Sequence, residues 1–173
     1  MKTLPYALLV FLTLVWPGTA RAQTKTVTAI SQAQITPVLE LTVSQAGQSE
    51  LRFGNIQPSA IDSIEAGPVL IVLNVNSNTG ERYQVTQMVN GTLRNVTGDE
   101  IPQEQLKFQT TALKSEGKYV ADITPVTASP QIIFESDALG SSDTIEARYT
   151  LTVPTAQAPG DYSALLTFTV STV

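Results

Sequence analysis

Apolar and polar residues alternate with a period of two along most of the chain after residue 37, and helical periodicity is nearly absent. The alternation is clearest at 145–153 and, after the turn residues Pro159-Gly160-Asp161, at 162–170. Successive side chains of a strand point to opposite faces, so each of these segments has one apolar and one polar face. The pattern predicts a protein built from strands.

Further strands are expected at 38–44, 51–56, 68–76, 82–89, 106–113, 118–123 and 131–135. The segment 68–76 is apolar on both faces at its centre, which is typical of a central strand. Turn residues at 76–81 favour a hairpin between this strand and the next one. We expect Asn90-Gly91 to form a tight turn, 102–105 a single helical turn and Gly54 a bulge or a bend.

These segments make about nine strands at spacings near ten residues, joined by turns rich in glycine, proline, asparagine and aspartate. Such spacing is typical of an all-β protein with an antiparallel, immunoglobulin-like β-sandwich. A closed barrel is the alternative architecture. The chain of 173 residues is long enough for one hydrophobic core. We expect the β-sandwich domain to span 38–173.

The first 22 residues have the pattern of a secretory signal peptide. Lys2 provides a positive charge, 6–16 is an almost unbroken apolar run, and Ala20 and Ala22 form a cleavage site before Gln23. The apolar run is too short for a settled membrane helix, although an N-terminal anchor is the alternative. The sequence predicts an exported protein without membrane insertion, located in the periplasm, at the cell surface or outside the cell.

Residues 23–37 form an N-terminal extension ahead of the first core strand. Part of it, 27–35, is uncharged and alternating, and places four apolar residues on one face: Val27, Ala29, Ala33 and Ile35. These are the candidates for an assembly strand donated to a neighbouring subunit by β-augmentation. The segment could equally complete the sheet of its own domain or act as a linker.

The charge balance bears on the choice of partner. Loss of Lys2 and Arg21 with the signal leaves eight basic against fifteen acidic residues, a net charge of −7. A phosphate backbone would repel such a chain, so we expect no nucleic-acid partner.

The composition also restricts the chemistry. The chain has no cysteine and no histidine, which excludes disulfides, thiolate metal sites and catalytic triads that use histidine. We therefore expect no catalytic residues, no metal site and no cofactor.

Two acidic clusters leave other chemistry open. Asp99 and Glu100 with Glu104, and the loop from Glu135 to Asp143, contain oxygen ligands that suit calcium, although neither has the spacing of a helical calcium loop. Paired carboxylates from different strands could also serve a glycoside hydrolase, but 23–173 contains no tryptophan to line such a cleft.

Three further residues have two interpretations each. Asn90 and Asn95 begin triplets that match the N-glycosylation acceptor, and the simpler interpretation is that they are turn residues. Tyr162 could be a corner tyrosine that bonds back to the backbone, or an ordinary inward aromatic.

Three segments resemble bacterial surface proteins: Leu51-Arg52-Phe53-Gly54-Asn55-Ile56-Gln57-Pro58, Glu81-Arg82-Tyr83-Gln84-Val85, and the run from Ala158 to Val170. The last resembles the closing strand of spore coat U-type and chaperone–usher fimbrial subunits. The first is similar to those and to cell-wall-binding WxL domains. The resemblance implies a secreted β-sandwich that works in an extracellular assembly.

We therefore expect a non-enzymatic structural or adhesive subunit of a bacterial surface appendage or coat. Its partners would be other subunits of the same or a similar type, with a periplasmic chaperone as a further candidate. The alternative is a monomeric module that binds carbohydrate or cell wall.

Overall fold

The computed structural model describes residues 34–43, 50–114 and 116–173, and Ile35–Val173 forms one compact unit. Within these ranges the protein is all-β, as predicted, and consists of two packed antiparallel sheets. The eight longer strands are β1 (Leu39–Val43), β2 (Glu50–Ile56), β3 (Ile64–Ser77), β4 (Tyr83–Arg94), β6 (Leu106–Ala112), β9 (Gln131–Glu135), β10 (Asp143–Val153) and β11 (Gly160–Thr172). Three more have two residues each: β5 (Glu100–Ile101), β7 (Lys118–Tyr119) and β8 (Thr124–Pro125).

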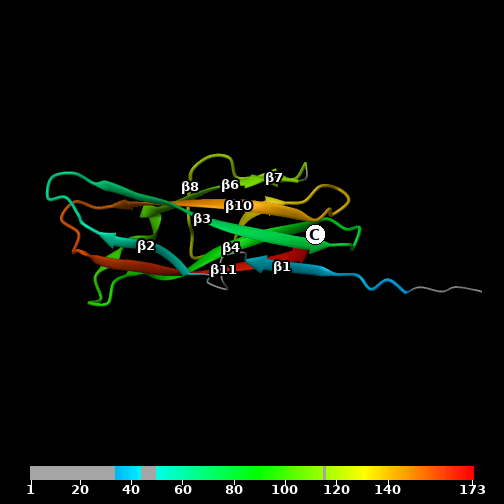
Figure 1. Ribbon diagram of the computed structural model, residues 1–173, viewed down its shortest axis with the longest axis horizontal. Helices are drawn as coiled ribbons and strands as arrows, with labels where there is room; N and C mark the ends of the chain where they lie inside the picture. Colours follow the sequence, from blue (N-terminus) through cyan, green and yellow to red (C-terminus); the bar gives the residue numbers. More distant parts are fainter. Residues whose placement is uncertain (1–33, 44–49, 115) are drawn as a thin grey trace, which may run out of the picture. The chain divides into compact units, whose positions relative to one another are not determined.

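The first sheet has the order β1-β3-β10-β6-β8, and the second has the order β2-β11-β4-β9-β7, with β5 also paired to β4 (Figure 1). An immunoglobulin sandwich has strands A-B-E-D in one sheet and C-F-G in the other. Here β1, β3, β10 and β6 take the places of A, B, E and D, while β4 and β11 take those of C and F. The place of strand G lies on the side of β11 that faces away from β4.

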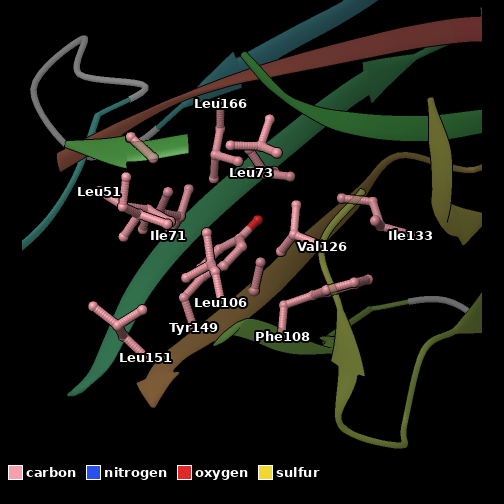
Figure 2. Close-up of a cluster of buried hydrophobic side chains, with 14 of the residues drawn as sticks. Leu51, Ile71, Leu73, Leu106, Phe108, Val126, Ile133, Tyr149, Leu151 and Leu166 are labelled. Carbon is pink, nitrogen blue, oxygen red and sulfur yellow. The ribbon is translucent and has the colours of Figure 1, made fainter. Parts of the chain in front are cut away.

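The core lies between the two sheets, where alternate side chains from both sheets meet (Figure 2). Tyr149 on β10 is fully buried, and its hydroxyl donates a hydrogen bond of 2.5 Å to the Gln87 Oε1 atom on β4. This bond joins the two sheets inside the core. The Gln87 Nε2 atom is buried without a hydrogen-bond partner.

The predicted hairpin between 68–76 and 82–89 is wrong. These segments form β3 and β4, which lie in different sheets: β3 pairs with β1 and β10, and β4 pairs with β11, β9 and β5. Both strands are apolar on their core-facing sides, so facing each other across the core buries those sides in a way that a flat hairpin cannot. The central position predicted for 68–76 is confirmed.

Two further expectations need correction. Asn90-Gly91 is not a turn, because both residues lie inside β4 at a register shift opposite β11, and Gly91 adopts a φ of +87°. The strand expected at 118–123 covers only Lys118–Tyr119, and Ile123 is exposed. The helical turn is present as the 3₁₀ segment η1 (Gln103–Gln105).

Of the bulge and the bend expected at Gly54, the structure has the bulge. Phe53 and Gly54 of β2 together oppose Tyr162 of β11, where the register shifts. Gly54 has a φ of +72°, a conformation that glycine adopts without the steric cost of a side chain.

Candidate functional site

Half of β11 has a free edge in the part of the chain that the structure describes. One side of the strand pairs with β4 along its length, from Ser163 to Thr172. The other side pairs with β2 only from Gly160 to Leu165. No described strand therefore occupies the place of strand G beside Leu166–Thr172.

The backbone groups on this free edge follow from the ladder with β4. The Val173 N–H donates to the Arg82 carbonyl at 2.9 Å, in register with the pair Thr172 and Tyr83. Alternate residues of an antiparallel strand direct their N–H and C=O groups to opposite sides. The groups of Leu166, Phe168, Val170 and Thr172 thus point away from β4, where an added strand could pair with them.

A groove of about 260 Å³ lies next to this edge, between β11 and β1. Its lining residues are Leu41, Val43, Leu166, Thr167 and Phe168. In Figure 1, β1 and the C-terminal half of β11 run alongside each other, although they belong to different sheets. The groove and the free edge form one continuous site, which we call the open edge.

The core is incompletely covered at the open edge. Five apolar side chains that pack against the core there are only partly buried: Leu39, Leu41, Val43, Phe168 and Val170. By contrast, Leu166, which lies two residues before Phe168 on the same face of β11, is only 1% exposed. An extended segment laid along the open edge could form ladder hydrogen bonds and cover these side chains at the same time.

The chain enters β1 through an exposed stretch. The Asn78 side chain holds it in place, because Asn78 Oδ1 accepts from the Val38 N–H at 2.6 Å and Nδ2 donates to the Thr36 carbonyl at 3.1 Å. Residues Ile35–Val38 are exposed and lead away from the sandwich (Figure 1).

The four assembly candidates are only partly within the described residues. Val27, Ala29 and Ala33 lie outside them, as do the expected signal peptide and its cleavage site. Ile35 is described, and 82% of its surface is exposed. Its apolar side chain therefore remains available to another molecule.

Sequence reasoning did not identify the open edge itself. Phe168 and Val170 were expected to face inward, which they do, but their incomplete burial could not be foreseen. One signal was present: Leu166–Thr172 contains no charge, proline or glycine, the residues that commonly protect an exposed edge.

A second pocket, of about 370 Å³, lies beside the bulge of β2. It is lined by Arg52, Gly54, Val96, Asp161, Tyr162 and Ser163. A side chain at Gly54 would meet no atom within 4 Å, so the bulge leaves open space above the backbone. Val96 is almost fully exposed on the pocket wall.

The first acidic cluster caps a loop. Asp99 Oδ2 accepts hydrogen bonds from Thr97 Oγ1 and Asn95 Nδ2, which hold the pKa of Asp99 below its usual range. Asn95 Oδ1 in turn accepts from the backbone N–H groups of Thr97 and Asp99. Glu100 forms an ion pair with Arg94.

The second acidic cluster also caps a loop, the one that precedes β10. Asp137 Oδ1 accepts from the N–H groups of Ser141 and Leu139, and these bonds lower the pKa of Asp137. Asp143 Oδ1 accepts from the Lys114 N–H at 2.9 Å. Among the described residues, no group of three or more acidic side chains is placed to hold a metal ion.

The asparagines of the two acceptor triplets have structural partners. Asn95 is 8% exposed and committed to the loop just described, so its amide is not accessible in the folded state. Asn90 is exposed, and its Nδ2 donates to Thr167 Oγ1 at 2.8 Å.

Tyr162 is a corner tyrosine, one of its two expected interpretations. Its hydroxyl donates to the carbonyl of Ala158, four residues earlier, at 2.7 Å. The same hydroxyl accepts from Gln157 Nε2 at 2.8 Å.

Comparisons with known proteins give little beyond this geometry. No protein-family model and no curated protein matches the chain. Among solved structures, it is similar to a family 123 glycoside hydrolase from Clostridium perfringens, with 16% identity and a TM-score of 0.39. The similarity covers 78% of this chain and 25% of that one, so the chain spans about a quarter of its length.

The described residues contain no helix with the length and apolar character needed to cross a membrane.

Proposed function

We propose that this chain is an exported, non-enzymatic structural or adhesive subunit of a bacterial surface appendage or coat. Its copies join when the segment Val27–Ile35 of one copy is added to the open edge of another. The observation that carries the proposal is that no strand of the described residues pairs with the outer side of Leu166–Thr172, where four residues direct backbone groups outward over a partly covered core.

The segment and the site are complementary in character. The segment is uncharged and alternating, and its apolar face carries Val27, Ala29, Ala33 and Ile35. Burial of this face would remove on the order of 150–200 Å² of apolar surface from water, roughly 4–5 kcal/mol before entropy is subtracted, at about 25 cal/mol per Å². Ile35, the last apolar residue of the segment, is 82% exposed and so remains accessible to another copy.

The test compares charge placed on the two faces of the segment. Val27→Asp with Ile35→Asp puts carboxylates on the apolar face, and Thr28→Asp with Gln34→Asp puts the same charge on the other face. We expect the first pair to abolish the growth of residues 23–173 into assemblies larger than a dimer in light scattering, because a buried charge is costly. The second pair should leave it unchanged.

Two results would contradict the proposal. If the first pair lowers the free energy of unfolding while the oligomeric state stays the same, the segment completes its own sheet. If neither pair changes stability or association, the segment is a linker. A chain beginning at Pro37 provides an independent check, since it should keep the fold and lose assembly beyond the dimer.

A second candidate function, a monomeric module that binds carbohydrate or cell wall, is favoured by the pocket at Arg52, Asp161 and Ser163. The lining thus includes a guanidinium, a carboxylate and a hydroxyl, the kinds of group that bind sugar hydroxyls. This candidate predicts a monomer that binds soluble peptidoglycan fragments or oligosaccharides in calorimetry and loses binding in Arg52→Ala. A monomer that binds none of them would exclude it.

A further inference from the structure

We infer that, before assembly, two copies of this chain close the open edge by pairing β11 with β11 about a two-fold axis. The inference rests on the proposed function and adds a way in which assembly is regulated. A copy whose β11 is paired in this way cannot accept the segment Val27–Ile35 of another copy. The two sheets that contain β11 would become one continuous antiparallel sheet.

The composition of the strand permits the approach of two copies. The chain is acidic, with fifteen acidic against ten basic residues, so most of its surface repels a second copy. Leu166–Thr172 is uncharged, and therefore places no like charges opposite each other when two copies meet along it. Each of the other outer strands has two residues or carries a charge: β7 and β8 have two residues each, β1 contains Glu40, and β2 carries Arg52 and the bulge at Gly54.

The strand is also complementary to itself. Leu166, Phe168, Val170 and Thr172 all direct backbone groups to the open edge, and an antiparallel pair centred on Thr169 brings all four into the ladder. On the core side, this register places Phe168 opposite Val170 of the other copy, a favourable pair of an aromatic and a β-branched residue. On the outer side, it places Thr169 opposite Thr169 of the other copy.

The partly buried residues of the groove favour the same arrangement. The axis runs through the open edge, so the two grooves lie next to each other. Phe168 and Val170 of one copy then cover the same residues of the other. The pairing thus satisfies the backbone and covers the core at one contact, which reduces the tendency of an unassembled copy to aggregate through its edge.

The experiment uses the absence of cysteine from the chain. Thr169 is exposed, and in the proposed register it forms a pair without ladder hydrogen bonds, whose Cα atoms lie about 4.5 Å apart. That separation is within the range of a disulfide. Residues 23–173 with Thr169→Cys should therefore form a covalent dimer under mild oxidation, read on a non-reducing gel.

Thr167→Cys is the matched control. It is exposed on the same face, but its partner in this register is Ser171 of the other copy. Thr167→Cys alone should form dimers at least about tenfold more slowly than Thr169→Cys, because only collision brings the two thiols together. A mixture of Thr167→Cys and Ser171→Cys should regain the faster rate and give the mixed dimer.

Equal dimer formation by Thr167→Cys and Thr169→Cys, or none by Thr169→Cys, would overturn the inference. The proposed function is tested separately by placing Val27→Asp with Ile35→Asp in the Thr169→Cys chain, where we expect undiminished cross-linking. Loss of cross-linking there would also overturn the inference. If Thr169→Cys fails while association still depends on Val27–Ile35, the dimer is wrong and the proposed function stands.

Discussion

Gln87 and Tyr149 form a polar contact at the centre of an apolar core. Gln87 is 1% exposed and Tyr149 is fully buried, so neither group can exchange its partner for water. A buried polar group without a partner costs about 1–3 kcal/mol, more than a satisfied hydrogen bond contributes. Disruption of this pair should therefore produce a measurable loss of unfolding free energy.

We predict that Tyr149→Phe lowers the free energy of unfolding by about 1–3 kcal/mol, because it leaves the Gln87 amide without a hydrogen bond. The double variant Tyr149→Phe with Gln87→Met removes both polar groups at similar volume and should recover most of the loss. Urea unfolding measures both. A double variant less stable than Tyr149→Phe would show that the amide is satisfied in another way.

The buried tyrosines also predict an alkaline limit of stability. Burial raises the pKa of Tyr149 and of Tyr83, and the nearby Asp143 and Asp137 raise that of Tyr83 further. An unfolded tyrosine loses its proton near pH 10, whereas the folded protein retains it, so the unfolded state binds fewer protons above pH 10. These two tyrosines should therefore leave the free energy of unfolding unchanged below pH 10 and lower it as the pH rises above 10.

Each such tyrosine contributes a slope of about −1.4 kcal/mol per pH unit once the unfolded form is ionised. In Tyr149→Phe, the decline of unfolding free energy between about pH 10 and pH 12 should be shallower by this amount. Urea unfolding across this range checks it. An unchanged slope would mean that Tyr149 ionises in the folded protein.

At the scale of elements, β11 has a different role along each half. Its first half is held on both sides, by β2 and β4, and its second half only by β4 among the described residues. Because backbone N–H groups alternate between the side that faces β4 and the open edge, removing one N–H group by substitution affects only one of the two sides. Ser171 directs its N–H toward Gln84 of β4, and Thr172 directs its N–H to the open edge.

We predict that Ser171→Pro destabilises the protein by about 1–3 kcal/mol more than Thr172→Pro, because only the first removes a ladder hydrogen bond. Both side chains are exposed, so side-chain burial contributes little to the difference. Thr172→Pro should instead weaken self-association, since it removes a donor from the open edge. Thermal unfolding and light scattering separate the two effects, and equal destabilisation would contradict the assigned backbone directions.

At the scale of the whole molecule, charge and the open edge act against each other. The net charge of the whole chain is −5, and that of residues 23–173 is −7. Leu166–Thr172 has no charge. Association through backbone and apolar contacts is insensitive to salt, whereas the repulsion between two acidic bodies is screened by it.

Self-association of residues 23–173 should therefore strengthen as sodium chloride rises from 0.01 to 0.5 M, over which the screening length falls from about 30 Å to below 8 Å. Analytical ultracentrifugation measures the association constant. Weaker association at high salt would mean that ion pairs between copies hold the contact, and the open edge would not be the interface.

Much of this molecule is determined by local pattern. Alternation at 145–153 and 162–170 specified two strands and their inward faces, because side-chain direction depends only on the extended backbone of that segment. The bulge at Gly54 has an equally local cause, the conformational freedom of glycine. The bond from Tyr162 to Ala158, four residues earlier, spans a turn that the sequence already marks with Pro159-Gly160.

The partners of the strands were decided only by the tertiary structure. The sequence predicts a hairpin between 68–76 and 82–89, yet β3 and β4 lie in different sheets. The burial of their apolar faces depends on residues far away in the chain, which local pattern does not reveal. Asn90-Gly91 became part of β4 because a long ladder with β11 outweighs a local turn preference. The open edge has the same origin: alternation tells which face of Phe168 and Val170 is buried, but not which strand lies beside them, since backbone hydrogen bonds carry no sequence pattern.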